Sequence, residues 1–307
     1  MPVNLSVVIG SVASERSIRD CLASVTASCA SVRAEVIVVD ASSDETASLV
    51  RRYFPTVKLI CLAPGTLTPV LWSTGIASAR GKRIATTTGH FVVPASWAGD
   101  LSAALDSGAA GAGGPVALRC DASVADRAIY FLRYSAFLPS DSRTVAQVSE
   151  IAGDNAMYER SLFEENRSLL ADGFWEVAIH RAMRTKGQRL VMVQSATAEF
   201  GKSFPVALIS HHRFAHGRHF GAWRVRQAGT SWARIAAAAP FVPFVLLARS
   251  ARRGLRSGGE FARFLTAAPL ILWLAACWAL GEAMGALQPR TAVTQVPELE
   301  GARAHRD

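Results

Sequence analysis

The sequence has few cysteines, and none of them forms a paired motif. The five are scattered over 307 residues and never form a C-x-x-C pair; they are Cys21, Cys29, Cys61, Cys120 and Cys277. An odd and dispersed set argues against a disulfide framework or a structural zinc site. It predicts reduced thiols, as in a cytoplasmic protein.

Several other signals are missing. The opening MPVNLSVVIG has neither the basic stretch nor the small-residue cleavage site of a signal peptide, so it is interpreted as a first strand. No G-x-G-x-x-G follows that strand, which argues against a Rossmann dinucleotide site. No basic stripe with interleaved aromatic residues is present, so no nucleic-acid partner is expected.

The charge balance is strongly basic. The net charge is +9 and the pI is about 9.9. A basic protein favours acidic partners, such as a phosphorylated substrate or an anionic membrane. The basic residues are densest between 213 and 263, where they flank apolar runs, and this placement favours a membrane surface.

The first 200 residues alternate apolar runs with helical patterns. The runs that predict strands are LSVVIG, which ends in glycine, EVIVVD, which ends in a carboxylate, VKLICL and RIATTT, and stretches with helical spacing separate them. This alternation predicts an α/β fold with a mainly parallel sheet flanked by helices. The first helix is expected from about Ser14, and Ser42 with Glu45 has the spacing of a capping box for the second.

The last third of the chain carries two further apolar segments. Residues 235–248 contain two prolines and, like residues 264–280, fall short of the ~20 residues that a membrane-spanning helix needs. The arginine-rich stretch between them is expected in the cytoplasm, on the catalytic side. The first segment is therefore interpreted as re-entrant or interfacial, and the second as interfacial or crossing once. The alternative is a buried helical hairpin of a soluble protein.

The domain organisation follows from this change in composition. We expect a catalytic domain over residues 1–226, a membrane-associated helical region over 227–287, and a polar tail over 288–307. The protein would act at the cytoplasmic face of the membrane.

Acidic residues at two places in the chain are candidates for chemistry. Asp40 ends EVIVVD, where open parallel sheets bind ligands, and could accept hydrogen bonds from a base or ribose; a turn or capping role is the alternative. Asp172, Glu176 and His180 follow at i, i+4 spacing and are predicted to share one helix face. A buried carboxylate there would have a raised pKa suited to a general base, whereas an ordinary solvated Glu–His pair is the alternative.

A histidine- and arginine-rich stretch precedes the apolar third. SHHRFAHGRHFGAWRVR includes Arg218 among four histidines and four arginines. Arginine's planar fork matches phosphate oxygens, so a phosphate-binding surface is predicted. A zinc site would lack carboxylate or cysteine ligands, and a solvated basic face against anionic lipid stays open.

Four blocks in order resemble the family-two inverting glycosyltransferases, which have the GT-A fold. They are LSVVIGSVASERSIRDCLASV, AEVIVVDASSDETASLV, PVLWSTGIASARG and RIATTTGHFVVPASW. The resemblance runs from about Leu5 to Arg226. It implies inverting, hexosyltransferase-type transfer of a sugar from a nucleotide-diphosphate donor to a lipid-linked or polysaccharide-precursor acceptor.

The resemblance also assigns roles to residues. A nucleotide site is implied at Ser11, Asp40, Ser42 and Ser43; Glu176 stands at the general base, with Asp172 nearby on the catalytic side. Asn155, in a G-x-N block, together with His180 and Arg218, is placed on the acceptor or phosphate side. The chain departs from the family pattern at Gly10, Ala41 and Trp72, the last of which replaces an arginine.

The largest departure concerns a metal-binding motif. Family members carry DxD at the end of the fourth strand, where it holds Mg²⁺ or Mn²⁺ on the donor diphosphate, and this chain has Thr88-Gly89-His90. Carboxylates suit these cations better than one imidazole. A divalent cation could bind through the diphosphate and His90, or arginines and His90 could neutralise the diphosphate without metal. Alternatively the protein has lost catalysis and serves as a binding or scaffold subunit.

A sugar nucleotidyltransferase is the remaining rival. It would share a nucleotide-binding α/β core, but it would need a basic, glycine-rich phosphate loop after the first strand. The segment GSVASERS offers little of that.

Overall fold

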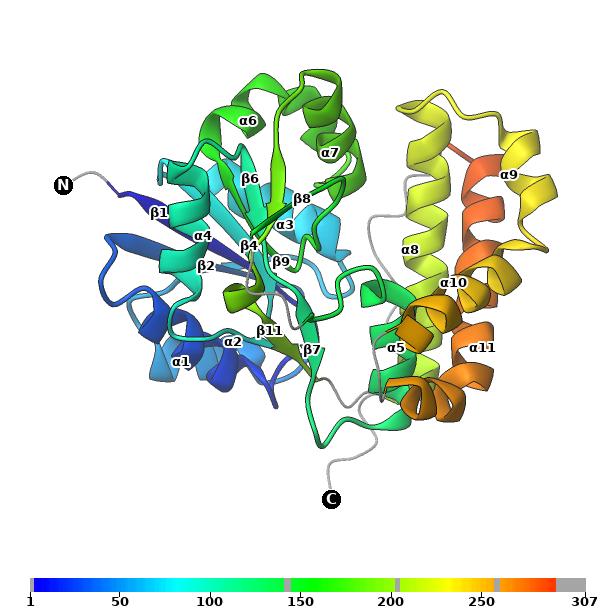
Figure 1. Cartoon of the computed structure of the whole chain (residues 1–307), viewed down its shortest axis with the longest axis horizontal. Coiled ribbons are helices and arrows are strands. Elements are labelled where there is room, and N and C mark those ends of the chain that lie inside the picture. Colours follow the sequence, from blue (N-terminus) through cyan, green and yellow to red (C-terminus); the bar gives the residue numbers. More distant parts are fainter. Residues whose placement is uncertain (1–2, 141–144, 202–204, 257–259, 291–307) are drawn as a thin grey trace. The chain divides into compact units, whose positions relative to one another are not determined.

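A computed structural model describes residues 3–140, 145–201, 205–256 and 260–290 (Figure 1). The chain forms two compact units. Unit 1 comprises Met1–Ala63, Thr68–Arg119 and Phe137–Gly201, and unit 2 comprises Pro64–Leu67, Cys120–Ala136 and Lys202–Asp307.

Unit 1 contains an eight-stranded sheet in the order β3-β2-β1-β4-β9-β6-β10-β8 and a three-stranded sheet in the order β5-β11-β7. The strands of the large sheet are β1 (Leu5–Ser11), β2 (Ala34–Asp40), β3 (Lys58–Cys61), β4 (Arg83–Thr88), β6 (Gly111–Gly113), β8 (Ala146–Val148), β9 (Asn155–Glu159) and β10 (Leu190–Met192). Those of the small sheet are β5 (Phe91–Val92), β7 (Val116–Leu118) and β11 (Ala198–Phe200).

The strands of the large sheet that come first in the sequence pair in parallel. β1 pairs in parallel with β2 and β4, and β2 pairs in parallel with β3. β9 enters antiparallel between β4 and β6. All seven residues of β1 are buried, as expected for a strand covered on both faces. The predicted α/β class, with a mainly parallel sheet flanked by helices, is confirmed.

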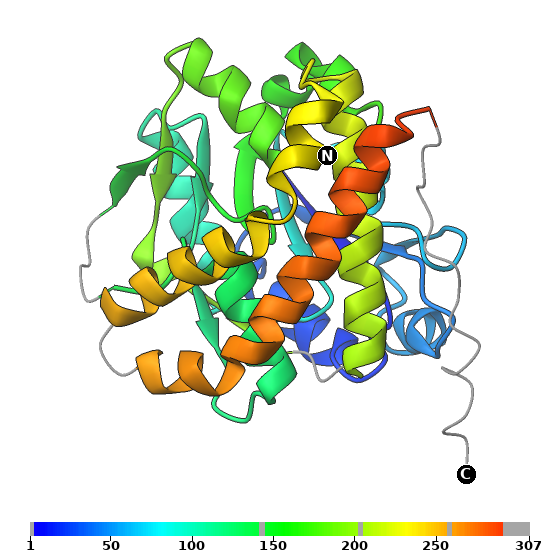
Figure 2. The ribbon, with the colours of Figure 1, turned by 90° about the vertical axis from the view of Figure 1, so that its right-hand side faces the viewer.

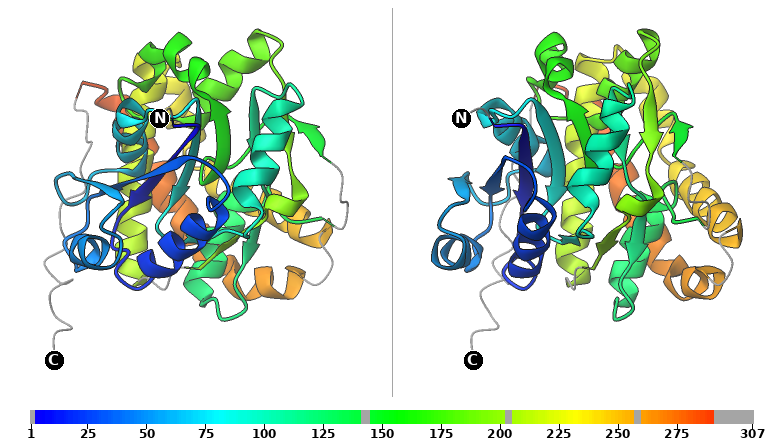
Figure 3. Two further views of the ribbon diagram at one scale, coloured as in Figure 1. Left: turned by 90° about the vertical axis from the view of Figure 1, so that its left-hand side faces the viewer. Right: turned by 60° about the vertical axis from the view of Figure 1, so that its left-hand side comes forward.

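The helices of unit 1 cover both faces of this sheet. They are α1 (Ile18–Ser28), α2 (Thr46–Tyr53), α3 (Thr68–Ser78), α4 (Trp97–Asp106), α6 (Arg160–Glu165), α7 (Glu176–Thr185) and the 3-10 turns η1 (Arg167–Leu170) and η2 (Gln194–Ala196). Gly75 of α3 lies against Val8 and Val39 on one face. Figure 3 shows α4 in front of the strands, on the face where Trp97 contacts Asn155.

Two helix starts differ from the sequence-based expectation. α1 begins at Ile18 rather than near Ser14. α2 begins at Thr46, and its first turn is satisfied by Asp44, whose Oδ1 accepts a hydrogen bond from Thr46 N at 3.0 Å. The capping box predicted for Ser42 and Glu45 is wrong, because the Ser42 hydroxyl is directed to Asp40 instead.

Unit 2 is helical, with α5 (Val124–Tyr134), α8 (Val206–Arg226), α9 (Trp232–Ala238), α10 (Val242–Arg256) and α11 (Glu260–Leu287). α8 and α11 lie side by side along much of their length (Figure 2). Glycines allow this approach: a Cβ on Gly217 would collide with the carbonyl of Trp278, and one on Gly281 with that of Phe214. The matching G-x-x-x-G spacing in GRHFG and GEAMG is typical of helix pairs in membranes, and the sequence analysis missed it.

Within the described residues, one helix is long and apolar enough to cross a membrane, at Phe261–Leu287. It extends the expected apolar segment at both ends. α9 and α10 are bent by 65° at their junction and pass the same test only as a broken pair. The predicted boundary at 226 does not coincide with the compact units, because α8 groups with the later helices. The predicted tail lies largely outside the described residues.

Candidate active site

The carboxyl end of β2 holds a buried carboxylate. Asp40 is 2% exposed, and the Ser42 hydroxyl donates to its Oδ1 at 2.6 Å. Burial raises the pKa of Asp40, and the hydrogen bond from Ser42 opposes that increase. The carboxylate therefore lies at the edge where open parallel sheets bind ligands, as the sequence predicts.

The loop after β1 holds Ser42 from the other side. The backbone N–H of Ala13 donates to Ser42 Oγ at 2.9 Å, and Ala13 has a positive φ of 49°. It is the one non-glycine residue with positive φ among the described residues, and such conformations cost about 1–3 kcal/mol and gather at ligand sites. Ser11 is buried opposite Asp40 in the β1–β2 ladder, whereas Ser43 is exposed on the loop. Sequence reasoning did not identify Ala13.

The β4 end carries the predicted diphosphate and metal region. His90 is buried, with Nδ1 at 3.0 Å from Ser17 Oγ and Nε2 at 3.2 Å from Ser14 Oγ. Both ring nitrogens thus contact serine hydroxyls in the loop just before α1. In the described part of the chain, no group of three or more His, Cys, Asp or Glu side chains could hold a metal ion by itself. Metal binding by His90 stays a prediction.

The predicted general base lies on the opposite face of the sheet from α1. α7 begins at Glu176, and a Cβ on Gly153 would lie 3.3 Å from both the Glu176 carboxyl carbon and the ring of Trp72. Trp72 is buried, donates from Nε1 to the carbonyl of Thr87 at 2.8 Å, and packs edge-on against Phe174. The Glu176 carboxyl therefore lies beside an apolar wall at the ends of β4 and β9.

The helix face predicted for this region is wrong. Asp172 precedes α7 rather than lying on it. His180 is fully buried, its Nε2 lies 2.9 Å from the Tyr158 hydroxyl, and burial lowers its pKa to about 3. His180 is therefore a core residue and does not contact an acceptor. The error arose because helical spacing places residues on one face without saying which face is buried.

Asn155 also has a structural role in place of the predicted acceptor-side role. Its Oδ1 accepts from Trp97 Nε1 at 2.7 Å, and its Nδ2 donates to the carbonyls of Pro115 and Ala196 at 2.9 and 3.0 Å. The side chain is fully buried and joins β9 to α4 and two loops. The neighbouring Asp154, which the sequence analysis did not single out, lies near Thr88, with 3.5 Å between Thr88 Oγ1 and Asp154 Oδ1.

Comparison with known proteins identifies the family. The family model described as glycosyl transferase family 2 matches residues 6–167, which is more than half of the 307-residue chain. The chain belongs to glycosyltransferase family 2. A comparison with curated protein sequences found no match.

One solved structure supports the fold of this family-2 glycosyltransferase. Residues 1–349 of S. aureus TarS in complex with UDP-GlcNAc match with a TM-score of 0.51 at 10% identity, over 88% of this chain and 89% of that chain. TarS 1–349 with UDP matches with a TM-score of 0.49 at 14% identity, over 88% and 89%. At such low identity the first match shows the GT-A fold alone, and the family assignment rests on the sequence model.

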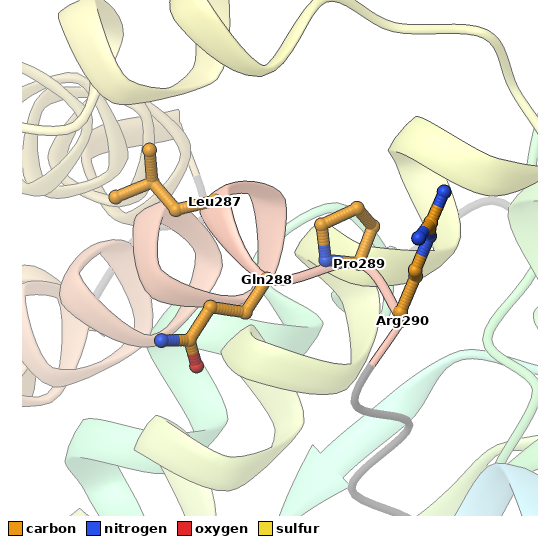
Figure 4. A pocket seen from close by; sticks show the side chains of 4 residues that line it. All are labelled: Leu287, Gln288, Pro289 and Arg290. Carbon is orange, nitrogen blue, oxygen red and sulfur yellow. The ribbon is translucent and has the colours of Figure 1, made fainter.

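The remaining candidate, Arg218, lies in unit 2 of this glycosyltransferase. Its guanidinium donates to Gln288 Oε1 at 3.3 Å, near a hollow of about 300 Å³ lined by Leu287, Gln288, Pro289 and Arg290 (Figure 4). Four consecutive residues line this hollow, and it has no carboxylate or aromatic ring for a nucleotide. A phosphate-binding role for Arg218 stays a prediction.

Proposed function

We propose that this glycosyltransferase moves a hexosyl group from a nucleotide-diphosphate sugar to a lipid-linked or polysaccharide-precursor acceptor, with inversion, at the cytoplasmic face of a membrane. The observation that carries the proposal is the placement of two acidic groups at one edge of the large sheet, where β1, β2 and β4 end and β9 begins. Asp40 ends β2, where the donor's nucleoside would bind, and Glu176 lies beside the Gly153 backbone at the start of β9.

The residues would act as follows. Asp40 accepts hydrogen bonds from the base or ribose, while the Ser42 hydroxyl fixes its orientation. Glu176 removes the proton of the acceptor hydroxyl as that oxygen attacks the anomeric carbon. The bond from this carbon to the diphosphate oxygen breaks, and the nucleoside diphosphate leaves with the bonding electrons. Attack opposite the leaving group inverts the configuration.

The surface of unit 2 supports a membrane-associated acceptor. α11 exposes Leu265, Trp273 and Leu280, the turn before α10 exposes Phe241, and α10 exposes Phe244. Large exposed apolar patches mark membrane or partner contacts, and tryptophans are enriched at membrane interfaces.

An apolar groove in unit 2 gives further support. It has a volume of about 670 Å³ and is lined by α9, α10 and α11, including Pro240, Phe244, Trp273 and Leu280. A hydrocarbon chain suits such a lining, because the side chains offer dispersion contacts and no charge. Exposed Arg249 and other arginines of α10 would meet anionic phosphate groups.

The experiment compares the full-length protein in lipid bicelles with its Glu176→Gln variant. Release of nucleoside diphosphate from UDP-, GDP- and dTDP-sugars is measured with a polyisoprenyl phosphate acceptor. Removing a general base lowers the rate by about 10²–10⁴-fold, while nucleoside diphosphate binding persists. Glu164→Gln, which alters an exposed carboxylate of a surface ion pair, is the matched control.

The outcomes separate the rival functions. A wild type that binds nucleoside diphosphates but transfers and hydrolyses nothing would favour the scaffold interpretation. Release of inorganic pyrophosphate from a nucleoside triphosphate with a sugar phosphate would favour a nucleotidyltransferase. A Glu176→Gln variant as active as wild type would remove Glu176 from the proposed mechanism.

A further inference from the structure

The end of β4 lacks the carboxylates that family 2 places there, but the carboxylate of Asp154 lies beside it, just before the neighbouring strand β9. β4 and β9 are antiparallel, and Thr87 pairs with Asn155. Next to this pair, Thr88 ends β4 and Asp154 lies in the turn just before β9, and their side-chain oxygens are 3.5 Å apart. Thr88 is the residue that stands at the first aspartate of the family motif.

Asp154 lies on the side of the sheet that carries the base. Successive side chains of a strand alternate between faces. Asn155 points to α4, where it binds Trp97, and its strand partner Thr87 shares that face. The next residue of β4, Thr88, therefore points to the opposite face, with the Asp154 carboxylate beside it. Gly153, next in the chain, lies against Trp72 and the Glu176 carboxyl on that face.

His90, at the second aspartate of the motif, is engaged elsewhere. Its two ring nitrogens contact Ser14 and Ser17, in the loop just before α1. Placing a cation on either nitrogen would break one of these contacts. Asp154 is therefore a better candidate than His90 for a cation ligand at this strand end, because it offers carboxylate oxygens.

The residues present fit a magnesium-type cation. Mg²⁺ is usually held by one or two carboxylates together with substrate phosphates and water, rather than by a complete set of protein ligands. Asp154 offers a carboxylate and Thr88 a neighbouring hydroxyl, both from buried side chains. A carboxylate in such surroundings attracts a cation more strongly than one in bulk water.

We propose that Asp154 supplies the metal-binding carboxylate that the end of β4 lacks, and that Thr88 supports it, so that a divalent cation binds here together with the donor's diphosphate. The proposal rests on the proposed transfer function and assigns a residue to its site. The cation would neutralise charge on the departing diphosphate. Asp154 would hold it on the same face of the sheet as Glu176.

The test measures Mn²⁺ binding by electron paramagnetic resonance, with UDP, GDP and dTDP each present or absent, on the full-length protein. We expect wild type to bind Mn²⁺ when a nucleoside diphosphate is present. Asp154→Asn should weaken this binding by about 100-fold or more, since even second-shell changes cost 10–100-fold. Glu164→Gln should leave it unchanged.

An exchange variant guards against a folding defect. Thr88→Asp combined with Asp154→Thr returns the carboxylate to β4 across the same strand pair and should recover most of the Mn²⁺ affinity. Far-UV circular dichroism and metal-free nucleoside diphosphate binding report whether each variant is folded.

Two results would overturn the inference while leaving the proposed function intact. One is a folded Asp154→Asn variant whose Mn²⁺ affinity lies within about twofold of wild type. The other is a wild type that transfers sugar at full rate in EDTA and binds no Mn²⁺ with any of the nucleoside diphosphates. A wild type that binds none of the three nucleotides, with or without Mn²⁺, would overturn the proposed function and the inference together.

Discussion

The hydroxyl of Tyr158 lies 2.9 Å from Nε2 of His180, and both side chains are fully buried beneath α7. The pair connects β9 to the helix that begins at Glu176. Burial lowers the pKa of His180 from 6.5 to about 3, so the ring is neutral at physiological pH. The pair therefore serves as a neutral polar contact within an aromatic core.

This pair predicts a pH-dependent loss of stability. Between pH 6.5 and about 3 the unfolded chain protonates this histidine while the folded chain does not. The contribution of neutral His180 to the free energy of unfolding is therefore fully present above the pKa of the unfolded chain. It is lost as the pH falls toward the pKa of the folded protein. In this range the free energy of unfolding falls by up to about 1.4 kcal/mol per pH unit because of this one histidine. Urea unfolding of wild type and His180→Gln at pH 8, 6 and 5 measures it, and equal pH slopes for the two proteins would contradict the assignment.

Gly153 is predicted to control the position of the base. A Cβ there would lie 3.3 Å from the Glu176 carboxyl carbon, so Gly153→Ala should displace that carboxyl by a few tenths of an ångström. We expect kcat to fall about tenfold or more with nucleoside diphosphate affinity unchanged, because small misplacements of a reacting group are costly. Gly99→Ala is the control, since a Cβ on Gly99 meets no atom within 4 Å. Wild-type kcat in Gly153→Ala would refute this role.

The burial of Asp40 lets us predict how donor binding depends on pH. Because burial raises its pKa, Asp40 gains a proton at a higher pH than an ordinary aspartate does, and a protonated carboxyl accepts hydrogen bonds poorly. Affinity for nucleoside diphosphate should therefore weaken on acidification from a pH above the ordinary value of 3.8. Asp40→Asn should weaken binding by about tenfold or more and flatten the profile. Calorimetric titrations from pH 7.5 down to pH 4.5 test this, and an unchanged affinity in the variant would place the nucleoside elsewhere.

The glycines between α8 and α11 predict a stability effect in unit 2. Gly281→Ala would push a methyl group into the carbonyl of Phe214, and the two helices would have to separate. Overpacking of this kind costs about 1–3 kcal/mol. Thermal unfolding in detergent measures it, with Gly254→Ala as the control because a Cβ there makes only ordinary contacts with Phe131 and Phe264 at 3.7 Å. Equal midpoints for the two variants would show that the helices can adapt.

Sequence periodicity predicted the sheet better than the helices. The run LSVVIG became a fully buried strand, because continuous apolar residues suit a strand covered on both faces. Asp40 was placed correctly, because the carboxyl ends of parallel strands share one edge. The start of α7 was missed: Asp172 lies before the helix, and helical spacing alone does not mark a first residue.

The sequence by itself determined the α/β class, the family, the acidic end of β2 and the missing aspartates at the end of β4. These are properties of consecutive residues. Only the tertiary structure decided that His180 and Asn155 are structural, and that Asp154 stands across from Thr88. Thr88 ends β4 and Asp154 precedes β9, and their proximity comes from the antiparallel register of these two strands, which no local pattern encodes.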